Sequence, residues 1–212
     1  MTGTHYRSVI LLPIIIIFFC IFLPCNHLIA EDGKVEVIIP EYDFGDNAIS
    51  IKLGANIPMF WISLPQINEK SIHATNLGLG GIVSVAWNAY INDSYTIGVD
   101  LGLALSADIN GSLLFMEPIL AKGSYVITTP EMEIPVSLGI GTIIMQLGDK
   151  TGFAFTLRPG ITAVWRITSE WSMGTTGEYW FSWAPPWVIT NPSHPHMLGN
   201  FFELSATAIY HF

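Results

Sequence analysis

Residues 95–105 read YTIGVDLGLAL, a stretch in which large apolar side chains alternate with small or polar ones. The apolar set is Tyr95, Ile97, Val99, Leu101, Leu103 and Leu105, and the other set is Thr96, Gly98, Asp100, Gly102 and Ala104. Successive side chains of a β-strand point to opposite faces of the sheet, whereas the faces of an α-helix repeat about every 3.6 residues. The period of two predicts a β-strand with one apolar face.

The same alternation recurs in seven further segments of the chain. These segments are residues 49–61, 77–91, 112–127, 132–146, 153–167, 171–183 and 201–212. Short connections at 92–94, 128–131 and 168–170 alternate with longer ones, of which 62–76 and 184–199 are the longest. Short turns that alternate with longer loops are typical of antiparallel transmembrane barrels, and an even number of strands places both chain termini at one end, so we expect eight antiparallel strands.

The composition restricts the class of protein. Half of the 212 residues are hydrophobic (50%), only 12% are charged, and the mean hydropathy is +0.48. Soluble domains carry about 25% charged residues, and disordered chains carry more charge with fewer apolar residues. The 17 acidic residues outnumber the 8 basic ones. The resulting net charge of −9 would repel phosphates and argues against nucleic acid as a partner. The composition therefore favours a membrane protein over a soluble one.

The first thirty residues have the pattern of a secretory signal peptide. Arg7 precedes an apolar run of 15 residues at 9–23, and Ala30 provides a small residue before a cut at Glu31. The run is shorter than the roughly 20 residues that a spanning helix needs, although an uncleaved anchor helix is the alternative. Cleavage would remove Cys20 and Cys25, so the mature chain would have neither a disulfide nor a cysteine metal site.

The face opposite the apolar one decides between a soluble barrel and a membrane barrel. That face consists mainly of Gly, Ser, Ala, Thr and Asn, which fit a narrow interior better than a surface in contact with water. Lipid admits only helices and closed sheets, because every backbone polar group needs a partner. We therefore predict an all-β fold: a signal peptide at 1–30, an acidic leader at 31–47, and an eight-stranded antiparallel transmembrane β-barrel at 48–212.

Charged side chains on the same face predict an ion-pair network inside the barrel. Its predicted members are Lys52, Asp100, Glu117, Arg158, Arg166, Glu178 and Glu203. A charge facing lipid at mid-depth would cost about 2–4 kcal/mol, whereas charges in a narrow lumen can pair. Lys52 and Arg158 are expected to neutralise some of the carboxylates. The alternative is that these carboxylates are catalytic.

The C-terminal run carries a resemblance to a known family. Apolar residues occupy alternate positions and end on an aromatic residue: Leu204, Ala206, Ala208, Tyr210 and Phe212. This run is similar to the assembly signal of small eight-stranded bacterial outer-membrane β-barrels, of the outer membrane protein W and X type. The resemblance covers residues 48–212 by pattern. It implies insertion into outer-membrane lipid, with the barrel-assembly machinery as a partner through the last strand.

Two functions follow from the resemblance, the first as the expected one and the second as its alternative. The W type implies a narrow channel or conduit for small hydrophobic solutes, which apolar interior residues would line: Phe60, Ile82, Leu113, Phe115, Ile143, Trp180 and Phe201. The X type implies a closed structural or adhesion barrel that presents the loops 62–76 and 184–199 to extracellular or host surface partners. Conductance across a bilayer would distinguish the two.

Catalytic and metal-binding motifs are weak in this sequence. His194 and His196 could hold a divalent metal, but no acidic or cysteine partner lies beside them in their proline-rich loop. Ser193 and His194 are adjacent, which does not favour a hydrogen bond between nucleophile and base. Gly78, Gly80 and Gly81 precede no helix, so they do not form a phosphate loop. We therefore expect neither a cofactor, nor a metal, nor an enzymatic activity.

Overall fold

The structure is a computed structural model that describes residues 42–64, 72–130, 132–148, 150–185 and 196–212. The predicted signal peptide and most of the predicted leader lie outside the described residues. No helix in the described part of the chain has the length and apolar character needed to cross a membrane.

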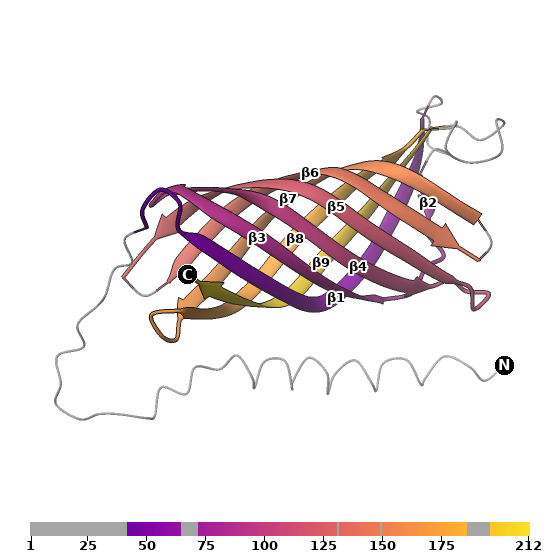
Figure 1. Ribbon diagram of the computed structural model, residues 1–212. Helices are drawn as coiled ribbons and strands as arrows, with labels where there is room; N and C mark the ends of the chain where they lie inside the picture. The colour runs from indigo at the N-terminus through magenta and orange to yellow at the C-terminus, as the bar shows by residue number, and fades with distance from the viewer. Residues whose placement is uncertain (1–41, 65–71, 131, 149, 186–195) are drawn as a thin grey trace, which may run out of the picture. The chain divides into compact units, whose positions relative to one another are not determined.

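Eight long strands and one short strand form a single antiparallel sheet. The strands are β1 (Asn47–Leu64), β2 (Ile72–Ala74), β3 (Gly80–Asn92), β4 (Tyr95–Ala107), β5 (Leu113–Thr128), β6 (Glu133–Leu147), β7 (Lys150–Arg166), β8 (Trp171–Ala184) and β9 (His196–His211). Each long strand pairs with the next one along the chain, and β9 pairs with β1 over Ala48–Leu64, which closes the barrel. Strand β2 pairs with Phe60–Ile62, near the C-terminal end of β1 (Figure 1).

This architecture confirms the predicted closed, eight-stranded antiparallel barrel. Each alternating segment of the sequence lies on one long strand, and most strands extend beyond the segment that predicted them. The predicted loop 62–76 contains β2, and β9 begins inside the predicted loop 184–199. Residues 108–112, between β4 and β5, form a turn in which Asp108 accepts hydrogen bonds from the backbone of Asn110 and Ser112.

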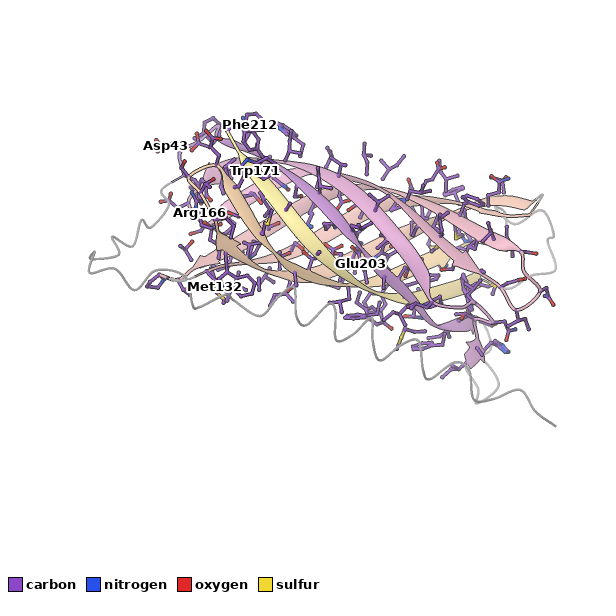
Figure 2. The ribbon with its side chains drawn as sticks, turned by 90° about the horizontal axis from the view of Figure 1, so that it is seen from below. Asp43, Met132, Arg166, Trp171, Glu203 and Phe212 are labelled. Atoms are coloured by element: carbon purple, nitrogen blue, oxygen red, sulfur yellow. The ribbon has the colours of Figure 1, made fainter. Side chains whose placement is uncertain are left out.

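The two ends of the barrel differ. The turn end holds residues 42–46, Phe212 and the short turns at 93–94, 129–132 and 167–170. Figure 2 shows Asp43, Met132, Arg166, Trp171 and Phe212 together at this end, with Glu203 in the middle of the barrel. The loop end holds the connections β1–β3, β4–β5, β6–β7 and β8–β9.

The outer face of the barrel is apolar. Large apolar side chains stand exposed on every long strand, and Leu53, with 67% of its surface exposed, is one example. Aromatic pairs flank this surface at the turn end, where Tyr95 packs on Tyr125 (5.1 Å between ring centroids) and Trp171 on Tyr210 (5.0 Å). Soluble monomers rarely expose contiguous apolar patches beyond a few hundred Å². The outer face of the barrel therefore requires an apolar environment.

Strand β5 has the opposite orientation from the predicted one. Leu113 and Phe115 lie exposed on the outer face, and Glu117 shares that face, whereas Leu114 and Met116 are buried inside. The sequence placed Leu113, Phe115 and Glu117 in the interior. Residues 113–116 are all apolar, so alternation does not show which of them face inward. The predicted orientation therefore depended on the assumption that Glu117 faces inward.

A β-bulge reverses the alternation near the end of β1. Pro58 pairs with Phe201, yet Phe60 pairs with Asn200, so Met59 is an extra residue. Beyond the bulge Trp61 packs edge-on against the interior ring of Phe201, at 5.8 Å between centroids. The sequence had placed Phe60 inside and Trp61 outside. Gly199 makes room for Trp61, because a Cβ on Gly199 would lie 2.6 Å from that indole ring.

Candidate functional site

The lumen is divided into layers, and strand β8 passes through all of them. From the turn end to the loop end, its inward side chains include those of Ser172, Thr176, Glu178 and Trp180. Each of these residues is almost fully buried. Ser172 belongs to a cluster around Tyr42, Thr176 to a hydroxyl-lined cavity, Glu178 to a charge layer and Trp180 to an apolar layer.

The charge layer consists of three cations and three carboxylates that six of the eight long strands contribute. Its members are Lys52, Asp100, Lys122, Arg158, Glu178 and Glu203. Lys52 Nζ lies 2.8 Å from Asp100 Oδ2 and 2.9 Å from Glu178 Oε2. Lys122 Nζ lies 2.9 Å from Glu178 Oε1. The formal charges of this layer sum to zero.

Arg158 is the centre of the charge layer. Its guanidinium pairs with Glu178, and its Nη2 lies 3.2 Å from Glu203 Oε2 and 3.4 Å from Asp100 Oδ2. Only 2% of the Arg158 surface is exposed. Gly160 makes room for this arrangement, since a Cβ there would lie 2.5 Å from Cγ of Glu178. Removing charges from water is costly, so mutual pairing is what allows six of them in the lumen.

Trp180 joins the charge layer to the apolar layer above it. The Arg158 Cζ lies over the Trp180 ring, 4.7 Å from its centroid, and Trp180 Nε1 donates to Glu203 Oε2 at 3.2 Å. The apolar layer consists of the buried residues Ile82, Ala104, Leu114, Met116, Ile143, Trp180 and Phe201, with Trp61, Leu77 and Met145 packed against them. Trp180 and Phe201 are 0% exposed. Side chains therefore fill the barrel towards the loop end.

A polar cavity of ≈ 50 Å³ lies on the other side of the charge layer. Seven hydroxyl side chains and two lysines contribute to its wall: Ser50, Lys52, Thr96, Lys122, Ser124, Ser137, Thr162, Thr176 and Thr207. Three of these hydroxyl groups form a chain in which Thr176 Oγ1 lies 3.0 Å from that of Thr162 and 2.6 Å from that of Thr207. A volume of this size holds a few water molecules.

Tyr42 occupies the turn end of the lumen. Its ring stacks on that of Tyr90, with centroids 3.9 Å apart and planes 13° apart, and lies 5.5 Å from the ring of His211. Its hydroxyl donates to Glu133 Oε1 at 3.0 Å and accepts from Arg166 Nη2. Arg166 also pairs with Glu133 at 3.0 Å. Burial raises the pKa of Tyr42, so its hydroxyl stays protonated.

The structure places the seven predicted lumen charges in three locations. It brings together Lys52, Asp100, Arg158, Glu178 and Glu203 in the charge layer. Arg166 lies at the turn end with Glu133, outside that layer. Glu117 is a correction, because it lies on the outer face of β5, where it pairs in register with Ile144 of β6. The C-terminal residues Leu204 and Phe212 lie exposed on the outer face of the barrel.

Sequence reasoning did not single out four polar side chains of the lumen, although it placed one of them, His211, on the interior face of the last strand. Lys122 was missed because residues 117 and 122 are an odd number apart on one strand, so an inward Glu117 requires an outward Lys122. Glu133 and His211 lie at strand ends, where alternation gives little signal. Tyr42 precedes the first strand, and no periodic pattern covers it.

The described residues contain no group of three or more His, Cys, Asp or Glu that could hold a metal ion. Ser193 and His194 lie outside the described residues, and the side chain of His196 is not described. The buried carboxylates of the charge layer all face cations, which satisfies their charge without a metal.

Comparisons with known proteins agree with this fold. A protein-family model matches residues 30–210. The chain belongs to that family. A protein of Borreliella burgdorferi, named only as uncharacterized, is 25% identical over 157 residues, which are 64% of this chain and 72% of that protein.

Solved structures of small barrels also resemble this chain. Neisserial surface protein A superimposes with a TM-score of 0.53 at 14% identity, over 79% of this chain and 97% of that one. The attachment invasion locus protein Ail of Yersinia pestis has a TM-score of 0.46 at 11% identity, over 80% of this chain and 99% of that one. The first similarity shows the fold alone, which is that of a small closed β-barrel.

Proposed function

We propose that this chain is a bacterial outer-membrane protein whose barrel is closed and serves as a rigid support for the connections at its loop end. Support for the membrane comes from the apolar exterior, because a closed sheet with exposed Leu, Ile, Val and Phe fits acyl chains. Support for the outer membrane comes from the barrel fold and from the signal-peptide pattern at 1–30. The loop end then faces outward, and both ends of the barrel sequence face the periplasm.

The filled lumen is the observation that supports a closed barrel rather than a conduit. A water-filled or solute-filled passage would leave its lining accessible, yet Ile143, Trp180 and Phe201 are 0% exposed. Arg158 and its three carboxylates close the next layer. Eight-stranded barrels have interiors just wide enough for side chains to fill. This arrangement favours the X-type resemblance over the W-type one.

The proposed partners follow from the two ends of the barrel. The loop-end connections, which include residues 62–76 and 184–199, would contact extracellular or host surface molecules. The outward row that ends with Tyr210 and Phe212 would present the last strand to the barrel-assembly machinery during insertion. Neither role requires a cofactor or a reaction, so we propose a non-enzymatic function.

Planar-bilayer recording with the purified, folded protein tests the closed barrel. We expect no discrete conductance steps, because the charge layer and the apolar layer fill the lumen. A porin recorded in the same bilayer provides the positive control, because its lumen is a water-filled channel. Regular single-channel events from the unmodified protein would overturn the closed barrel and favour the W-type conduit.

A further inference from the structure

The walls around Tyr42 come from four strands that are distant from it in sequence. Tyr90 belongs to β3, Glu133 to β6, Arg166 to β7 and His211 to β9. They provide a flat ring to stack on, an acceptor and a donor for the hydroxyl, and a second ring at the side. The wall thus matches every feature of a phenol: its faces, its O–H and its lone pairs.

We propose that the turn end of the lumen is a binding site for a phenol ring, and that Tyr42 fills this site as a releasable stopper over the polar cavity. The site is formed by the barrel strands, whereas its occupant comes from the segment before β1. This inference does not depend on the proposed display of the loops.

Tyr90 links the stopper to the cavity. One face of the Tyr90 ring carries Tyr42, and the Tyr90 side chain is also part of the cavity wall. Ser124, Thr96 and Lys122 line the same cavity. Tyr42 is 7% exposed and stacks on the Tyr90 ring, which is itself part of the cavity wall. Withdrawal of Tyr42 would expose the hydroxyl-lined wall and Lys122.

The backbone around Tyr42 is held to the barrel by few hydrogen bonds. Beside the ring contacts, the Tyr42 backbone N–H donates to Asp93 Oδ1 at 2.6 Å, and Gly45 N–H donates to the Tyr90 carbonyl at 3.1 Å. The residues between these two anchors are exposed, and Phe44 has 84% of its surface exposed. Segments with few buried contacts open at a lower free energy than the sheet that supports them. Tyr42 can therefore leave while the barrel stays closed.

Thiol labelling of the cavity wall tests the stopper. Ser124→Cys places a thiol in the cavity, in a chain whose Cys20 and Cys25 are replaced by serine, and a small methanethiosulfonate reagent reports access to it. In the folded protein we expect slow labelling with Tyr42 in place and labelling about tenfold faster or more with Tyr42→Ala, because the reagent then reaches the cavity without a local opening step. Phe44→Ala, which changes an exposed ring of the same segment, should leave the rate unchanged.

A free phenol tests the binding site itself. Truncation of a buried ring leaves a cavity that small molecules of matching shape can fill. In Tyr42→Ala, p-cresol should slow the labelling of Ser124→Cys again, whereas toluene, which lacks the hydroxyl, should have a smaller effect. In Tyr42→Phe, which keeps the stacked ring, labelling should stay close to the slow rate. p-Cresol should not change the rate while Tyr42 is present.

Two results would overturn the proposal. Equal labelling rates with Tyr42 and with Tyr42→Ala would show that Tyr42 does not close the cavity. Fast labelling in Tyr42→Ala that p-cresol leaves unchanged would show that the wall does not recognise a phenol. If Tyr42→Ala fails to fold, as judged by heat-modifiable gel mobility, p-cresol should restore folding during refolding and toluene should do so less well. Failure of both molecules to restore it would also overturn the binding site.

Discussion

Arg158→Ala is expected to lower the free energy of unfolding by about 3–5 kcal/mol, because it leaves buried carboxylates without their partner. Arg158 is the cation that contacts Asp100, Glu178 and Glu203 together. Its removal also takes the guanidinium from the face of Trp180. Urea unfolding of the protein in phospholipid vesicles, followed by tryptophan fluorescence, measures the loss.

Two further variants separate charge from packing. Arg158→Lys keeps one positive charge but cannot reach three carboxylates with a planar fork, so we expect an intermediate loss. Glu117→Gln removes a carboxylate that lies outside the charge layer and should change the free energy by less than about 0.5 kcal/mol. An Arg158→Ala protein as stable as the unmodified one would show that the charge layer does not hold the barrel together.

Ile140→Arg is expected to cost about 2–4 kcal/mol of folding free energy in lipid, because it puts a charge on the outer face at mid-depth. Ile140 lies in the middle of β6 and has 58% of its surface exposed. In register it faces Ala121 of β5 and Leu157 of β7. The same urea titration measures the cost.

Gln146→Arg is the matched control for Ile140→Arg. Gln146 is exposed on the same strand and the same face, but it lies one residue from the loop end of β6. A charge near the membrane interface costs only about 0–1 kcal/mol. Equal and small effects at both positions would mean that the outer face of β6 contacts water rather than acyl chains.

Alternation predicted the strands because every strand of a closed barrel has one face towards the lumen and the other towards the outside. In β4, from Tyr95 to Leu105, each outward residue is large and apolar and each inward one is small or polar, so both strand and orientation were evident from the sequence. The rule gave no orientation in β5, where residues 113–116 are apolar on both faces. The interior there is the apolar layer, so inward and outward side chains have the same chemistry.

Position along the strand explains the orientation of β5 once the structure gives its bounds, because Glu117 and Lys122 are equally far from the middle of the predicted segment 112–127. Glu117 and Lys122 must face opposite sides, and they lie about 16 Å apart along the strand at about 3.3 Å per residue. Lys122 is closer to the middle of β5 than Glu117. A charge facing lipid costs most at mid-depth. The less costly assignment therefore buries Lys122 and leaves Glu117 outside.

Interactions between segments distant in sequence could not be predicted from the sequence. The bulge at Met59 depends on how β1 pairs with β9, and a single extra residue reversed the faces of Phe60 and Trp61. Tyr42 lies in an acidic segment with no period, and its partners Tyr90 and His211 lie far away in the chain. Such contacts become visible only when the barrel brings its strands together.

Nitroxide labels along the outer face of β4 test most directly whether this barrel lies in lipid. With labels at Ile97, Val99, Leu101 and Leu103 in vesicles, collision rates are measured with oxygen, which dissolves in acyl chains, and with a nickel chelate, which stays in water. We predict that oxygen collisions dominate at all four positions, and that the nickel chelate dominates at a label on Asp93 in the adjacent turn. Dominant nickel collisions along the whole of β4 would contradict the membrane barrel.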